Sequence, residues 1–136
     1  MPVFPSGEWM QALCAQLVAQ PEAGRLADVL AGRYRLVVQP AGALVDQHVY
    51  EVTIAPSANG TPRVTWSGGD GAAATLEFSA DYERWQQLIS GTLDIPLAIV
   101  LGRLRVRGDL ARITGNAGYA RPLLDALRAV DTQWLP

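Results

Sequence analysis

The chain has 136 residues, enough for one domain and too few for two, because a domain usually holds roughly 100 to 200 residues. Hydrophobic residues make up 49% of the sequence and charged residues 18%, so apolar burial is sufficient to offset the ordering entropy, and global disorder is excluded. The formal net charge of -2 lacks the basic excess of a nucleic-acid-binding protein. We expect residues 1–136 to form a single folded domain with no nucleic acid partner.

Composition also restricts the chemistry that the chain can perform. All 11 basic residues are arginine, so lysine Schiff-base catalysis is excluded. The single cysteine, Cys14, has no internal disulfide partner, and with a single histidine, His48, it cannot complete a Cys/His zinc site. We expect no metal and no cofactor, and a reducing compartment.

The sequence carries no signal for secretion or membrane insertion. No charged leader with a small-residue cleavage site follows Met1. The longest apolar run, residues 95–101, is far shorter than the roughly 20 residues of a membrane-spanning helix. We expect a cytoplasmic protein without a transmembrane segment.

The first 30 residues predict two helices. Ser6 is a suitable N-cap for a helix over residues 7–20, in which apolar side chains recur at three- and four-residue spacing. The chain restarts at Pro21, and residues 26–30 predict a short second helix that Gly32 ends.

The next section alternates between apolar and polar residues, which is typical of half-buried strands. Four strands are expected, over residues 33–39, 49–54, 63–67 and 74–78. Asn59-Gly60 marks a hairpin turn. The glycine-rich residues 67–71 predict a second hairpin turn rather than a phosphate-binding loop, because such a loop leads into a helix.

Two helices are expected after the strands. Ser79 opens the first, which carries an apolar stripe and closes near Gly91. Asp94 and Pro96 start the second, over residues 97–101. No side chain of this second helix is polar, so it must be buried or must face an apolar partner.

The remaining residues predict one more strand and two more helical stretches. Residues 103–107 alternate strictly, with three arginines on the wet side, and residues 110–114 are apolar. The last helix places Leu123, Leu124, Leu127 and Val130 on one face. Hairpin-linked strands followed by helices predict an α+β fold, with a mainly antiparallel sheet and helices packed on one face.

Few residues suggest catalysis. His48, near Asp46, is interpreted as a solvated edge residue, with a general base as the alternative. Cys14 is interpreted as a small buried thiol rather than a nucleophile, because no base adjoins it. The acidic residues occur singly, and Glu51, Glu77, Asp94 and Asp109 would pair only through tertiary contacts.

Arg103, Arg105 and Arg107 present a row of guanidinium groups at a spacing of two. A solvated sheet face is the simplest interpretation, and binding of anionic head groups or an acidic partner is the alternative. Apolar surface is the other notable feature, because helical stripes and strand faces are hydrophobic along most of the chain.

Three segments, SADYERWQQLISG, LDIPLA and LGRLRVRGD, cover residues 79–91, 93–98 and 101–109. In order and spacing they resemble the sterol carrier protein type 2 domain family, and in particular its stand-alone bacterial members. In that family a helix ending in glycine leads to a Leu-Asp-Pro-like turn, an apolar helix and a strand of alternating basic residues. Residues 1–78 agree by pattern more than by motif, and the C-terminal residues differ from a peroxisomal signal.

The resemblance implies a five-stranded sheet, helices on one face and an apolar tunnel between them. Carried over by position, the tunnel would be lined by Val52, Ile54, Trp66, Phe78, Trp85, Leu88, Ile89, Leu97, Val100, Leu101, Leu124 and Leu127. No catalytic residue and no metal ligand is implied. The strand residues depend on register, because a shift of one residue exchanges the two faces of a sheet.

The leading hypothesis is a lipid carrier that is not an enzyme. Its tunnel would bind a sterol, fatty acyl chain, acyl-CoA, phospholipid or isoprenoid quinone by desolvation, at about 0.8 kcal/mol per buried methylene. One alternative is an accessory subunit that presents a lipid or quinone intermediate to an enzyme complex and docks through the arginines. Another is a small enzyme that uses His48 or a carboxylate in the tunnel. Transient membrane contact and a homodimer are further possibilities.

Overall fold

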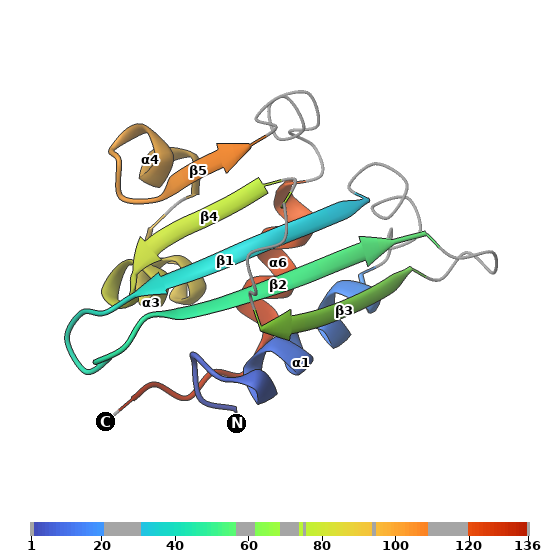
Figure 1. Cartoon of the computed structure of the whole chain (residues 1–136), viewed down its shortest axis with the longest axis horizontal. Coiled ribbons are helices and arrows are strands. Elements are labelled where there is room, and N and C mark those ends of the chain that lie inside the picture. The colour runs from blue at the N-terminus through green and yellow to red at the C-terminus, as the bar shows by residue number, and fades with distance from the viewer. Residues whose placement is uncertain are drawn as a thin grey trace.

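The computed structural model describes residues 2–20, 31–56, 62–68, 74, 76–93, 95–108 and 120–135, with the side chains of 95–96 and 120–124 left aside. One layer is a sheet of five strands, and helices pack behind it on one face (Figure 1). The strands are β1 (Gly32–Gln39), β2 (His48–Ala55), β3 (Arg63–Gly68), β4 (Leu76–Asp81) and β5 (Arg105–Gly108). The helices are α1 (Gly7–Val18), α3 (Tyr82–Ser90), α4 (Ile95–Val100) and α6 (Ala120–Ala129). The α+β class with helices on one face is therefore confirmed.

The strand order in the sheet is β3-β2-β1-β4-β5. Three of the neighbouring pairs are antiparallel, and only β1 and β4 run parallel. A mainly antiparallel sheet of five strands was expected and is confirmed.

Strands β3 and β4 do not form the hairpin that the glycine-rich residues between them predicted. A hairpin would pair β3 with β4, but β3 pairs with β2, and β4 pairs in parallel with β1. A parallel neighbour requires a crossover connection rather than a tight turn. The sequence showed turn-forming residues but not which strands they join.

Helix α1 begins where the sequence predicts. The Ser6 side chain accepts a hydrogen bond of 3.1 Å from the Trp9 backbone N–H. The inner face is buried and packs against β3 and α6. It consists of Trp9, Met10, Leu13, Cys14 and Leu17.

The N-cap of helix α3 lies two residues later than predicted. The strand β4 continues to Asp81, because Ala80 and Asp81 remain paired with β1. The Asp81 carboxylate, and not Ser79, caps the helix by accepting a 2.8 Å hydrogen bond from the Arg84 N–H. The end of the helix is as predicted, since Gly91 has a left-handed φ of 85°.

Helix α4 ends in a hydrogen-bonded turn that also delays β5. The Arg103 N–H donates to the Ala98 carbonyl at 2.8 Å, and the Gly102 N–H donates to the Ile99 carbonyl at 3.1 Å. With Gly102 at a φ of 71°, this is a Schellman motif. Arg103 and Leu104 complete this turn, so the strand predicted from residue 103 begins at Arg105.

The core lies between the sheet and α1, α3 and α6. Its largest fully buried side chains include Trp9, Tyr82, Met10 and Leu88. The Phe4 ring packs against Trp9 at a centroid distance of 4.7 Å and against Trp134 at 6.1 Å, which brings both ends of the described chain into the core. Several expectations lie outside the described residues: the helix over 26–30, the turn at 59–60, the cap at Asp94 and the apolar stretch 110–114.

Candidate functional site

The four strand residues of the predicted tunnel share one face of the sheet. Val52 and Ile54 lie in the core, and Trp66 and Phe78 are partly buried and pack against it. The register agrees, because Val52 lies opposite Trp66 on the neighbouring strand. The structure therefore places all four on the helix-covered side.

The α3 residues of the predicted tunnel face these strands. Trp85, Leu88 and Ile89 are buried, and Leu88 is fully inaccessible. The Trp85 indole N–H donates a 2.9 Å hydrogen bond to the Val37 carbonyl of β1. Leu127 of α6 is buried in the same cluster, whereas the side chain of Leu124 lies outside the described residues.

The α4 residues of the predicted tunnel are exposed. Leu97, Val100 and Leu101 have exposed fractions of 49%, 81% and 51%. The inner side of α4 is Ala98, which is fully buried, and Ile99, which packs against the core. The all-apolar helix is thus covered on one side only, and its other side presents apolar surface outward.

Two cavities of the described surface are lined mainly by polar groups. One, of about 340 Å³, lies over the outer side of α3 and includes Glu83, Gln86 and Gln87. The other, of about 380 Å³, lies on the sheet face away from the helices. Its lining residues are Arg35, Val37, Gln39, Gln47, Val49, Glu77, Ser79, Arg105 and Arg107.

A charged cluster occupies this outer face of the sheet. Arg35 of β1 donates to Glu51 of β2 at 2.9 Å and to Glu77 of β4 at 3.3 Å. Glu51 is only 4% exposed. These hydrogen bonds raise the pKa of Arg35 above its usual value, the Glu51 bond being the largest cause. The cluster holds three adjacent strands together and keeps the Arg35 charge neutralised.

This cluster could not be recognised in the sequence, because its three members come from separate strands. Arg35, Glu51 and Glu77 each look like an isolated charge on a polar strand face. Alternation placed them on polar faces, but only the pairing of Arg35 with both Glu51 and Glu77 in register brings them together.

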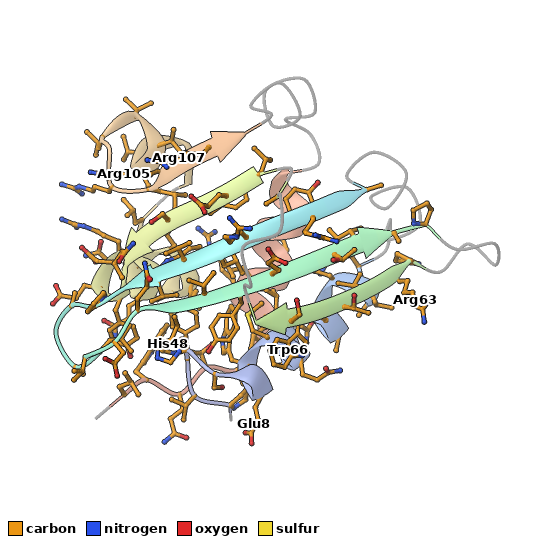
Figure 2. The ribbon with its side chains drawn as sticks, in the orientation of Figure 1. Glu8, His48, Arg63, Trp66, Arg105 and Arg107 are labelled. Carbon is orange, nitrogen blue, oxygen red and sulfur yellow. The ribbon has the colours of Figure 1, made fainter. Side chains whose placement is uncertain are left out.

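The arginines of the β5 region are exposed, as expected. Arg105 and Arg107 line the cavity on the outer sheet face, and Figure 2 shows them at the sheet edge where α4 lies. Arg107 lies opposite Glu77 in register, but the Glu77 carboxylate is bonded to Arg35. Arg103 is also exposed but belongs to the turn before the strand.

His48 and Cys14 show no catalytic arrangement in the described part of the chain. The His48 ring lies 3.2 Å from the Tyr50 hydroxyl through Nδ1 and stacks on the Tyr50 ring. Cys14 is buried, as expected, and burial raises the pKa of its thiol to about 11. A thiol with this pKa stays protonated near neutral pH and is a poor nucleophile.

Two further properties concern metals and membranes. Within the described ranges, His, Cys, Asp and Glu side chains nowhere gather in a group of three that could hold a metal ion. Of the helices in the same ranges, none combines the length and the apolar character that crossing a bilayer requires.

The fold and the apolar face of α3 define a class of protein: an open five-stranded sheet whose inner face meets helices across a strongly apolar layer. The sequence matches the profile of the SCP-2 sterol transfer family over residues 10–121, most of its length. The chain belongs to this family. A comparison with curated proteins gave no match.

Solved structures have the same fold. A conserved hypothetical protein of Thermus thermophilus, described as possibly a sterol carrier protein, is 27% identical with a TM-score of 0.69, over 94% of this chain and 90% of that one. A crystal structure of sterol carrier protein 2 is 24% identical with a TM-score of 0.74, over 92% and 97% of the two chains. A UbiJ-SCP2 ubiquinone synthesis protein shares the fold at 16% identity and a TM-score of 0.57, over 96% of each chain. The resemblance found in the sequence is therefore confirmed, as are the five-stranded sheet and the helices that it implied.

Proposed function

We propose that this chain binds a hydrophobic ligand between the sheet and helices α3 and α4, and carries it without converting it. Membership of a sterol transfer family supports a lipid ligand. The observation that carries the proposal is the apolar outer side of α4, where Leu97, Val100 and Leu101 remain exposed beside the core residue Ala98. Binding of an apolar ligand over exposed apolar surface next to a core is favourable, because it removes that surface from water.

The proposed binding site uses the apolar face of α3 as its floor. Trp85, Leu88 and Ile89 form one stripe of this helix, and the strand residues Val52 and Phe78 face it across the core. Binding by desolvation needs few polar contacts, so a sterol, an acyl chain or a quinone tail would fit the same apolar lining. Each buried methylene of the guest contributes about 0.8 kcal/mol.

Ligand binding is tested in solution with delipidated protein and a fluorescent fatty acid, without vesicles. We expect binding that unlabelled lipids displace, and a rise in melting temperature on the order of 10 °C at a ligand concentration of about 100 times Kd. The lipids for displacement are a fatty acid, an acyl-CoA, a phospholipid, a sterol and an isoprenoid quinone. Absence of binding to every lipid of this panel would overturn the proposal.

A charged substitution locates the site. Leu97→Asp places a carboxylate beside the apolar lining, so we expect the Kd to rise at least about tenfold, since burying a charge is costly. Val45→Asp is the matched control, because Val45 is an exposed apolar residue far from α4 in the chain, with an exposed fraction of 82%. Equal effects of the two variants would show that the ligand does not bind beside α4.

A second candidate is an accessory subunit that presents the ligand to an enzyme. The exposed Arg105 and Arg107 favour it, because they offer an acidic partner a docking surface. Charge reversal of these arginines would abolish co-purification of such a partner while ligand binding in solution stays unchanged. A carrier that acts alone would be indifferent to the same change.

A further inference from the structure

The contacts of helix α4 with the core leave one of its apolar sides facing outward. Leu97, Val100 and Leu101 are spaced three and four residues apart, so they form one stripe on a helical surface. The inner side of the helix is held by Ala98, and Leu104, the last residue of the terminal turn, is only 2% exposed. The Schellman motif at Gly102 fixes the direction of the chain between Ala98 and Leu104. The exposed stripe is therefore a defined surface and not a frayed end.

Three arginines follow this apolar stripe before the next acidic residue, Asp109. Residues 95–108 include Arg103, Arg105 and Arg107 and no acidic residue. All three arginines are exposed, and Arg105 and Arg107 line the cavity of about 380 Å³ on the outer sheet face. Glu77, which lies opposite Arg107 in register, is bonded to Arg35 instead. The β5 edge thus combines exposed apolar side chains with cations that are available to a ligand.

We propose that α4 and the β5 region form a docking surface for bilayers of anionic phospholipid. Leu97, Val100 and Leu101 enter the boundary between head groups and acyl chains, while Arg103, Arg105 and Arg107 bind lipid phosphates. The docking surface shares Leu97, Val100 and Leu101 with the proposed ligand site, whereas Arg103, Arg105 and Arg107 serve docking alone. Docking does not require a bound ligand, and it would bring the proposed ligand site to the membrane.

The chemistry of the surface favours a bilayer over other occupants. A short amphipathic element with apolar residues on one side and arginines beside them matches the layered polarity of a membrane interface. Guanidinium groups form paired hydrogen bonds with phosphate oxygens, which suits a layer of lipid head groups. A second copy of the chain would bring two rows of arginine together and is disfavoured by repulsion.

Vesicle flotation tests the docking surface directly. The full chain is mixed with vesicles of phosphatidylcholine alone, or of phosphatidylcholine with about 30% phosphatidylglycerol, which supplies a negative surface potential. We expect binding to the anionic vesicles that weakens as salt rises, and little binding to the neutral ones. Equal binding to both compositions, or binding to neither, would overturn the proposal.

Paired variants separate the apolar part from the cationic part. Val100→Asp is expected to weaken binding to anionic vesicles at least about tenfold, whereas Val45→Asp, a valine with nearly the same exposed fraction, leaves it unchanged. Arg105→Gln and Arg107→Gln are each expected to weaken it about fivefold, the equivalent of about 1 kcal/mol. Arg63→Gln is the charge control, because Arg63 lies at the opposite edge of the sheet (Figure 2).

Other occupants of this surface would give different results. Equal losses from Val100→Asp and Val45→Asp, or from Arg105→Gln and Arg63→Gln, would show that the β5 edge is not the contact. A dimer that Val100→Asp dissociates, seen by light scattering, would assign the stripe to a second copy and overturn bilayer docking. Circular dichroism confirms that each variant is folded. Solution binding of the fluorescent fatty acid by Arg105→Gln and Arg107→Gln, which lie outside the proposed ligand site, distinguishes failure of docking from failure of carriage.

Discussion

The indole N–H of Trp85 donates a 2.9 Å hydrogen bond to the backbone carbonyl of Val37, which ties helix α3 to the central strand β1. Both residues are buried, with exposed fractions of 5% and 6%. A buried carbonyl that loses its donor costs free energy, because no water replaces the bond. Trp85 therefore holds the apolar face of α3 against the sheet, in addition to its proposed place in the ligand site.

Replacement of this indole tests its structural role. Trp85→Phe removes the donor and part of the ring, so we expect the free energy of unfolding to fall by about 1–3 kcal/mol, measured by urea denaturation. Trp66→Phe is the control, because the Trp66 indole donates to Gln11 at 3.2 Å in an exposed position. A loss from Trp66→Phe as large as that from Trp85→Phe would contradict the assignment.

The charged cluster on the outer sheet face gives a second prediction. Glu51→Gln leaves Arg35 without its shorter and more buried ion pair, so we expect a loss of about 1–3 kcal/mol in the free energy of unfolding. Glu77 is more exposed and its bond is longer, at 3.3 Å, so Glu77→Gln should cost about 1 kcal/mol or less. Urea unfolding of the two variants checks this order, and the reverse order would refute it.

The buried thiol of Cys14 predicts a pH dependence at alkaline pH. Its pKa is about 11 in the folded chain against an ordinary value of 9.0. Well below pH 9 the thiol is protonated in both states and contributes no dependence. As the pH rises toward 11, the unfolded chain loses the proton first, so the free energy of unfolding falls by about 2–3 kcal/mol.

Cys14→Ala isolates this contribution. Unfolding curves of the parent and the variant are compared across the pH range, so that tyrosine titration cancels in the difference. The parent should lose stability relative to Cys14→Ala between about pH 9 and 11 and show no such trend below about pH 8. A flat difference would mean that the thiol is not buried as the structure has it.

The turn after α4 predicts a conformational effect at a single glycine. Gly102 has a φ of 71°, and a Cβ there would meet no atom within 4 Å. Gly102→Ala is therefore expected to lower the free energy of unfolding by about 1 kcal/mol, because alanine is strained in the left-handed region. Gly102→Asn is expected to lower it less, because asparagine tolerates this region better. Gly68→Ala is the control, because its Cβ also meets open space while its backbone is not left-handed. Thermal unfolding of the three variants measures the difference.

The amphipathic helices were the most predictable part of this protein. The stripe of α3 was recognised because Tyr82, Trp85, Leu88 and Ile89 repeat at helical spacing, and this spacing depends on neighbouring residues alone. The Ser6 cap of α1 is local for the same reason. The start of α3 was missed, because the pairing of β4 with β1 extends the strand to Asp81.

The candidate site was predictable only in part. Alternation and family resemblance placed Val52, Ile54, Trp66 and Phe78 on the helix-covered face, where the structure has them. Their role in ligand binding stays a prediction. The exposure of Leu97, Val100 and Leu101 could not be read from an all-apolar helix, because periodicity carries no information when every residue is apolar.

The sequence by itself determined the helical stripes, the alternating strands, the buried thiol and the family, because each of these depends on residues close together in the chain or on a contiguous motif. Only the tertiary structure decided that β4 runs beside β1, that Arg35 joins Glu51 to Glu77, and that α4 turns its apolar side outward. The physical reason is that strand order, ion pairing and burial depend on which distant segments share a surface. Local spacing does not specify those contacts.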